Sequence, residues 1–144
     1  MNIKLSKIAS LLSLDLIGVD TNIYNLTIDS REVKKGDFFV AIEGIKFDGH
    51  DFILESISKG ACAILCNDRF DVSKINVPYI VCQDTLKSLA DLAAGYRKII
   101  GSPLTIGITG TNGKTTVTQL TTAILKQCFS VSTTLGNYNN CLLY

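Results

Sequence analysis

The sequence predicts an α/β protein made of a small first domain and the start of a second domain with a mostly parallel sheet. Short apolar runs alternate with segments of helical periodicity along the 144 residues, as in folds whose strands are joined by crossover helices. Apolar residues make up 47% of the chain and charged residues 19%, so a packed core is expected and extended disorder is excluded. One clear break in composition, Gly101-Ser102-Pro103, follows the longer first part. We therefore expect domains over residues 1–101 and 104–144.

The N-terminal segment predicts an amphipathic helix rather than a signal peptide. Leu5, Ile8 and Leu12 recur at helical spacing, and Asp15 interrupts the apolar run that a signal peptide would need. No apolar run of the chain reaches the length of a membrane span.

The rest of the first part predicts alternating strands and helices. We expect strands over residues 24–28 and 38–42, a helix over 51–59, strands over 61–66 and 79–82, and a long helix from residue 84 or 85. Gly60 is well placed to end the shorter helix, and Asp84 or Thr85 to cap the longer one. The apolar stripe expected on the long helix consists of Leu86, Leu89, Ala90, Ala93 and Tyr96.

Charge and cysteine content exclude several classes of function. With 14 basic and 13 acidic side chains the net charge is +1, which argues against nucleic acid as the main partner. The five cysteines are odd in number and lack the spacing of a disulfide scaffold, so we expect free thiols in a reducing cytoplasm. A single histidine leaves too few ligands for a zinc site. We expect a cytoplasmic monomer.

The second part contains a glycine-rich turn that predicts a phosphate-binding loop. The turn lies between an apolar run over residues 104–108, which predicts a strand, and a helical pattern over 114–127, with a further strand expected near 129–132. Peptide N–H groups of such a turn and of the helix N-terminus point at an anion. Lys114 would neutralise charge on the terminal phosphates, and the Thr115 hydroxyl would ligate the accompanying Mg²⁺. The predicted binding residues are Gly110, Thr111, Asn112, Gly113, Lys114, Thr115 and Thr116, with Lys114 and Thr115 acting in catalysis.

The loop departs from the full phosphate-loop pattern in one position. That pattern has a glycine five residues before Gly113, where this chain has Ile108. The alternative interpretation is an ordinary turn whose lysine is only solvated. The predicted strand and helix on either side favour the phosphate loop.

With this shortened loop the chain resembles the Mur ligases, the ATP-dependent amide-forming enzymes of bacterial cell-wall precursor synthesis. The related folylpolyglutamate synthases have a similar loop. The first part is similar to the Mur ligases through four segments in the same order: Thr27-Ile-Asp-Ser-Arg31, Val33-Lys-Lys-Gly-Asp-Phe-Phe-Val-Ala-Ile42, Phe47-Asp-Gly-His-Asp-Phe52 and Lys59-Gly-Ala61. The tail Gly136-Asn-Tyr-Asn-Asn140 resembles the members that add the terminal D-alanyl-D-alanine dipeptide.

The resemblance implies a two-step reaction with ATP and Mg²⁺. ATP would phosphorylate the C-terminal carboxylate of UDP-N-acetylmuramoyl-tripeptide, and the amine of D-alanyl-D-alanine would then attack the acyl phosphate. Residues 1–101 would form the UDP-binding substrate domain, and residues 104–144 would begin the ATPase domain.

The resemblance also implies candidates for the substrate pocket. Carried over by motif, these are Ser30, Arg31, Phe47, Asp48 and His50, together with Asn137, Asn139 and Asn140 beyond the second strand of the ATPase domain. An arginine suits a pyrophosphate, and an aromatic ring can cover uracil. The alternatives are structural: Arg31 would pair with Asp29, His50 would cap a helix, and Phe47 would belong to the core.

The chain departs from the family by stopping early. The remaining ligands of the ATPase domain and a third domain would lie beyond Tyr144, so we expect a truncated chain that cannot complete the reaction. Three alternatives stay open. They are a Mur ligase that adds the third residue of the peptide, a different ATPase or folylpolyglutamate-type synthase, and a non-catalytic module that binds a nucleotide sugar.

Overall fold

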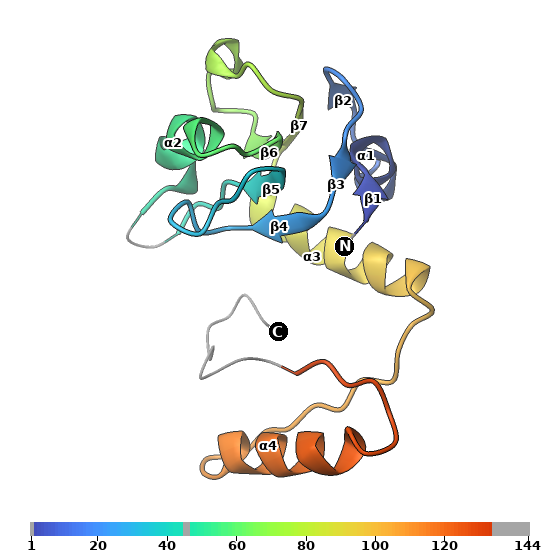
Figure 1. Ribbon diagram of the computed structural model, residues 1–144. Helices are drawn as coiled ribbons and strands as arrows, with labels where there is room; N and C mark the ends of the chain where they lie inside the picture. The colour runs from blue at the N-terminus through green and yellow to red at the C-terminus, as the bar shows by residue number, and fades with distance from the viewer. Residues whose placement is uncertain (1, 45–46, 134–144) are drawn as a thin grey trace. The chain divides into compact units, whose positions relative to one another are not determined.

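The computed structural model describes residues 2–44 and 47–133, and the chain divides into two compact units (Figure 1). The first unit is Met1–Ser102 and the second is Pro103–Tyr144. The boundary falls within the Gly101-Ser102-Pro103 break in composition.

A five-stranded sheet forms the centre of the first unit. Its strands are β2 (Leu16–Ile17), β4 (Asn25–Thr27), β5 (Asp37–Val40), β6 (Ala63–Asn67) and β7 (Tyr79–Cys82), in the order β2-β7-β6-β5-β4. Strands β4 to β7 pair in parallel, and β2 adds an antiparallel edge. The predicted α/β class with a mostly parallel sheet is confirmed, and the described sheet lies in the first unit.

Helices and shorter elements complete the chain. They are β1 (Ile3–Lys4), α1 (Leu5–Leu12), β3 (Asn22–Ile23), the 3₁₀ helix η1 (Gly49–Phe52), α2 (Ile53–Ser58), the 3₁₀ helix η2 (Val72–Lys74), α3 (Thr85–Ile99) and α4 (Lys114–Leu125). Strands β1 and β3 form a separate antiparallel pair. The three two-residue strands β1, β2 and β3 were not predicted, because two residues are too few to show the alternation of a strand.

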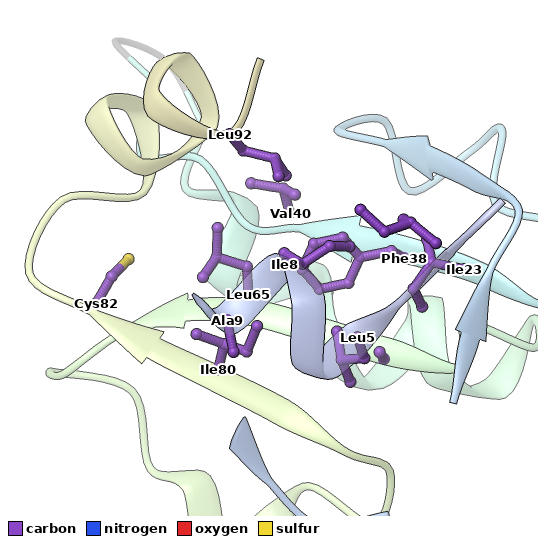
Figure 2. Packing of buried hydrophobic residues seen from close by; sticks show 12 residues of the cluster. Leu5, Ile8, Ala9, Ile23, Phe38, Val40, Leu65, Ile80, Cys82 and Leu92 are labelled. Atoms are coloured by element: carbon purple, nitrogen blue, oxygen red, sulfur yellow. The ribbon is translucent and has the colours of Figure 1, made fainter. Parts of the chain in front are cut away.

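Both faces of the sheet are covered, and this explains the continuous apolar runs of its strands. On one face Phe38 and Leu65 pack with residues of α1 and α3, as Figure 2 shows. On the other face the neighbouring residues Phe39 and Ile64 pack with Ile53 of α2. Consecutive residues of β5 and β6 therefore enter opposite cores.

The buried face of α3 differs from the predicted stripe. Thr85, Ser88 and Leu92 are buried, with Leu89 and Tyr96 half-buried beside them. The predicted stripe residues Leu86, Ala90 and Ala93 are exposed instead. The prediction counted only apolar residues, whereas the start of α3 turns two small polar residues toward the unit's interior.

The second unit contains a single described helix. α4 begins at Lys114 as predicted and ends at Leu125. The predicted strands over residues 104–108 and 129–132 were wrong for the described structure, which has no strand between residues 103 and 133. A strand is defined by hydrogen bonds to a neighbouring strand, and the described part of this unit offers neither segment such a partner.

The helices of residues 2–44 and 47–133 include none that is both long and apolar enough to cross a bilayer.

Candidate functional site

The loop before α4 ends in a left-handed glycine, which suits the predicted phosphate site. Gly113 is the N-cap residue of α4 and has a φ of 77°. This left-handed conformation is unfavourable for residues with a Cβ, whereas glycine adopts it readily. Its carbonyl accepts the N–H of Val117 at 2.8 Å and so closes the first helical turn. No side chain caps this helix and no acidic residue lies in its first turn, so the positive end of the helix dipole faces outward without a competing carboxylate.

Lys114 lies back across the loop. Its Nζ donates a hydrogen bond of 2.5 Å to the carbonyl oxygen of Gly110, and its own carbonyl accepts from the Thr118 hydroxyl at 2.8 Å. Lys114 is half-buried, whereas the predicted binding residues Gly110, Thr111, Asn112, Gly113, Thr115 and Thr116 are all exposed. A carbonyl oxygen of the loop itself therefore holds the ammonium group of Lys114.

The donor set fits Mg²⁺ bound together with a nucleotide. Within the described ranges no cluster of three or more His, Cys, Asp or Glu side chains could hold a metal on its own. Mg²⁺ bound with a nucleotide needs only one or two protein oxygen ligands, since phosphates and waters supply the others. Thr115 is an exposed residue, and its hydroxyl is an oxygen ligand of the required type.

Ser30 and Arg31 lie just beyond β4, at the carboxyl edge of the first unit's sheet. The Arg31 guanidinium pairs with the Asp29 carboxylate through Nη2–Oδ2 at 2.6 Å and Nε–Oδ1 at 2.9 Å. Hydrogen bonds from Arg31 lower the pKa of Asp29 to about 2. Arg31 is nonetheless 85% exposed, so its remaining N–H groups face solvent.

A lysine side chain also stabilises the turn that contains Ser30 and Arg31. Ser30 is buried, and its carbonyl oxygen accepts a hydrogen bond of 2.9 Å from Nζ of Lys59. The same ammonium pairs with Glu55 at 2.5 Å. Lys59 therefore ties the turn after β4 to the end of α2.

Main-chain hydrogen bonds join the two ends of the segment that follows β5. The N–H of Gly44 donates to the carbonyl of Phe47 at 2.9 Å, and Gly49 closes the base of the loop against Ile42. A Cβ on Gly49 would lie 2.6 Å from the Ile42 nitrogen, so only glycine fits there. Phe47 is 73% exposed and does not belong to the core.

His50 is buried at the base of this loop with both ring nitrogens engaged. Nε2 accepts the main-chain N–H of Asn67 at 2.9 Å, so the proton of the neutral ring is on Nδ1, which lies 2.6 Å from Oδ1 of Asp48. Partial burial raises the pKa of Asp48, but hydrogen bonds from His50 outweigh it and lower that pKa overall. The sequence alternative had His50 as a helix cap, whereas Asp48 is the residue that caps η1. His50 therefore connects the loop to the end of β6.

A polar pocket of about 450 Å³ opens at the carboxyl ends of β6 and β7. Asn67, Arg69 and Thr85 contribute to its lining, together with Glu43, Gln83 and Asp84. None of these six residues was predicted from the sequence as a binding residue. Their position in the sequence could have indicated them, because Asn67 ends one buried strand and Gln83 follows the next. Ligands of open α/β sheets bind beyond such strand ends.

Asn137, Asn139 and Asn140 lie outside the described residues. The cysteines that are described, Cys62, Cys66, Cys82 and Cys128, are free thiols. Burial raises the pKa of the Cys66 thiol to about 11, so it stays protonated and behaves as a core residue rather than a nucleophile.

Both units match known protein families. Residues 22–97 match the Mur ligase family, catalytic domain, and residues 108–143 match the Mur ligase middle domain. The first match alone spans more than half of the chain.

Individual relatives point in the same direction. UDP-N-acetylmuramoyl-tripeptide–D-alanyl-D-alanine ligase of Escherichia coli is 35% identical over 97% of this chain and 30% of its own length. UDP-N-acetylmuramoyl-L-alanyl-D-glutamate–2,6-diaminopimelate ligase of Aquifex aeolicus is 45% identical over 81% of this chain and 24% of its own length. The chain thus spans about a third or less of the curated relatives it matches.

Solved structures give the same result. A crystal structure of MurF from Acinetobacter baumannii superposes with a TM-score of 0.87 at 26% identity, covering 99% of this chain and 31% of that one. The MurF ligase of Thermotoga maritima in complex with ADP gives a TM-score of 0.63 at 36% identity, over 80% of this chain and 26% of that one.

Proposed function

Because this chain belongs to the Mur ligase family, we propose that it carries the UDP-sugar-binding domain and the ATP phosphate loop of a peptidoglycan-precursor ligase. The proposed ligase joins D-alanyl-D-alanine to UDP-N-acetylmuramoyl-tripeptide at the expense of ATP. The observation that carries the proposal is the start of α4, which no side chain caps and where Lys114 is held over Gly110. Nearly the whole of this chain matches UDP-N-acetylmuramoyl-tripeptide–D-alanyl-D-alanine ligase.

In the proposed reaction a carboxylate oxygen of the tripeptide attacks the γ-phosphorus of ATP, which gives an acyl phosphate and ADP. The amine of D-alanyl-D-alanine then attacks the acyl carbon, and phosphate leaves. Such a transfer depends mainly on positioning and on neutralising phosphate oxygens. Lys114 would exchange the Gly110 carbonyl for a phosphate oxygen, while Gly110, Thr111, Asn112, Gly113 and Thr116 shape the loop. Mg²⁺, held with the phosphates by Thr115, would neutralise further charge.

The first unit would hold the UDP end of the substrate. The N–H groups of Arg31 that face solvent are suited to a diphosphate, and the exposed ring of Phe47 is suited to cover a flat or apolar group. Ser30 would shape the turn that carries Arg31, and Asp48 with His50 would fix the loop that carries Phe47. Asn137, Asn139 and Asn140 remain candidates for binding the peptide part of the substrate. Free thiols among the described cysteines support a cytoplasmic location.

A second candidate is the ligase that adds the third residue of the peptide. It is favoured by the 45% identity, over 121 aligned residues, to the diaminopimelate-adding enzyme of Aquifex aeolicus. Both candidates share ATP, Mg²⁺ and a UDP-N-acetylmuramoyl-peptide, and they differ in the length of that peptide and in the group that is joined to it.

Isothermal titration of the 144-residue chain tests this proposal. UDP-N-acetylmuramoyl-tripeptide should bind, and an Arg31→Gln variant should bind it about tenfold more weakly because a charge-assisted hydrogen bond to phosphate is lost. The control is Asp71→Asn, which alters an exposed side chain next to η2 and should leave the affinity unchanged. Absence of binding by the unsubstituted chain would overturn the proposal. Tighter binding of the UDP-linked dipeptide than of the tripeptide would favour the second candidate.

A further inference from the structure

The two helices that cover one face of the sheet, α1 and α3, border an open groove of about 620 Å³. The end of α1 contributes Leu11 and Leu12 to its lining, and the second half of α3 contributes Ala94, Gly95 and Ile99. Leu11 and Leu12 are half-buried, and Ile99 is exposed. Helices pack by placing the side chains of one into the grooves of another, so an apolar groove of this kind suits a further helix.

Two small residues, Ala94 and Gly95, lie halfway along the α3 side of the groove. A Cβ on Gly95 would lie 3.0 Å from Cδ2 of Leu11, so the glycine lets α1 pack closely against α3. Ala94 is exposed, and its methyl group extends little beyond the helix backbone. The distance between two packed helices depends on the side chains at their contact, so another helix can approach α3 closely at this point.

Two opposite charges, Asp91 and Lys98, also line the groove. Both are exposed, whereas Leu92 beside Asp91 belongs to the core that Figure 2 shows. Within residues 2–44 and 47–133 neither charged side chain forms an ion pair or a hydrogen bond. They are seven residues apart in α3, about 20° short of two helical turns, so they lie on one side of the helix about 10 Å apart along its axis.

The spacing of these charges makes the groove complementary to a second copy of itself. The point midway between residues 91 and 98 falls between Ala94 and Gly95, where the side chains of α3 are smallest. An antiparallel α3 that crosses there places the second copy's Lys98 opposite Asp91 and the second copy's Asp91 opposite Lys98. A parallel copy in register would instead place like charges together. Two-fold symmetric interfaces make every such contact twice.

The groove lies away from the candidate substrate residues of the first unit. α3 begins at Thr85, just beyond the carboxyl end of β7, and Arg31 follows β4 on the same edge of the sheet. Asp91 and Lys98 lie about 9 and 20 Å further along α3, at 1.5 Å per residue. A second copy bound in the groove would therefore leave the carboxyl edge of the sheet open to substrate.

We propose that two copies of this chain associate through this groove as a two-fold symmetric dimer, with antiparallel α3 helices and with Asp91 and Lys98 of each copy paired across the interface. The sequence predicted a monomer, because the self-complementary charges are recognisable only once α1 and α3 are seen side by side. Two helices bury less surface than a standard interface, so we expect a dissociation constant of about 10–100 μM. The dimer does not depend on the proposed ligase function.

Two charge reversals test the interface by sedimentation equilibrium of the 144-residue chain from about 5 to 500 μM. Asp91→Lys and Lys98→Asp each place like charges at both pairs, and each should raise the dissociation constant about 10- to 100-fold. Lys74→Asp is the control, because it makes the same change in η2, which packs on the opposite face of the sheet. It should dimerise as the unsubstituted chain does. Urea unfolding of each variant verifies that the fold is retained.

An equimolar mixture of the Asp91→Lys and Lys98→Asp chains provides the sharpest measurement. Each chain alone opposes like charges, whereas the mixed dimer has a lysine facing an aspartate at both pairs. The mixture should therefore recover the dissociation constant of the unsubstituted chain while each variant alone stays monomeric over the same range. The proposal is overturned if the unsubstituted chain stays monomeric, if the single variants dimerise as it does, or if the mixture does not recover the dimer.

Discussion

Nε2 of His50 accepts the main-chain N–H of Asn67 at 2.9 Å, and this bond joins the loop after β5 to the carboxyl end of β6. The two residues are 17 positions apart, and both are buried. The same imidazole holds Asp48 through Nδ1. One side chain thus determines how two neighbouring strand ends are arranged at the edge where we propose that substrate binds.

Replacing His50 should therefore cost more than a surface substitution. His50→Ala leaves the buried N–H of Asn67 without an acceptor, and we expect the free energy of unfolding to fall by about 2–3 kcal/mol. His50→Gln places an amide oxygen near the position of Nε2 and should recover about half of the loss. Urea unfolding checks both values, and equal stabilities for the two variants would contradict the proposed role of the bond.

The pair of Asp29 and Arg31 should make stability depend on acidity. The pKa of Asp29 is lowered from 3.8 to about 2, so the folded state binds this proton less readily than the unfolded state. The contribution is complete above about pH 4 and is lost as the pH falls toward 2. Because Arg31 is 85% exposed, solvent screening limits the contribution to about 0.2–1 kcal/mol. Urea unfolding of Arg31→Gln at pH 6 and pH 2.5 should show a clearly larger deficit at pH 6 than at pH 2.5, and an equal deficit at both would contradict this account.

Removing a buried hydroxyl should stabilise the first unit. Oγ of Ser56 is fully buried in α2 and has no hydrogen-bond partner among the described residues. Ser56→Ala ends this desolvation cost and should raise the free energy of unfolding by about 1 kcal/mol. Ser58→Ala on the same helix is the matched control, because it gains the same helix propensity but loses the bond of 2.7 Å from its hydroxyl to the Glu55 carbonyl. A control as stabilising as Ser56→Ala would show that burial is not the cause.

Replacing the left-handed glycine of the proposed phosphate loop should weaken nucleotide binding. Replacing a left-handed glycine of the first unit should leave nucleotide binding unchanged. Gly113 and Gly36 have φ of 77° and 90°, and an added Cβ would meet nothing within 4 Å at either position. Alanine at either position therefore adds about 1 kcal/mol of backbone strain without a clash. We expect Gly113→Ala to weaken Mg-ATP binding by about tenfold and Gly36→Ala to leave it unchanged, measured by isothermal titration. An equal effect of both changes would show that the loop geometry is not specific to the nucleotide.

Several features were predictable from sequence because they depend on neighbouring residues only. The buried strands β5, β6 and β7 follow from continuous apolar runs, and the start of α4 follows from the Gly113-Lys114 step. The buried face of α3 was displaced because Thr85 and Ser88 are polar, and a periodicity of apolar residues does not count them. The strands expected over residues 104–108 and 129–132 require pairing partners, which a local pattern does not specify.

The candidate site shows the same division. The proposed phosphate loop is a contiguous motif, so its residues and the left-handed Gly113 were accessible to sequence reasoning. The partners of His50 and the pocket around Asn67 and Thr85 depend on contacts between strand ends that are distant in the chain. No spacing rule relates residues 50, 67 and 85 before the order of the strands is known.

Titration of Mg-ATP into the 144-residue chain and its Lys114→Met variant tests the central claim most directly. A charged hydrogen bond to phosphate contributes about 1.5–3 kcal/mol, so the variant should bind about 10- to 100-fold more weakly. Lys126→Met removes the same charge at the opposite end of α4 and should bind as the unsubstituted chain does. If all three chains bind Mg-ATP with one affinity, or if none binds it, the loop from Gly110 to Thr116 is not the nucleotide site.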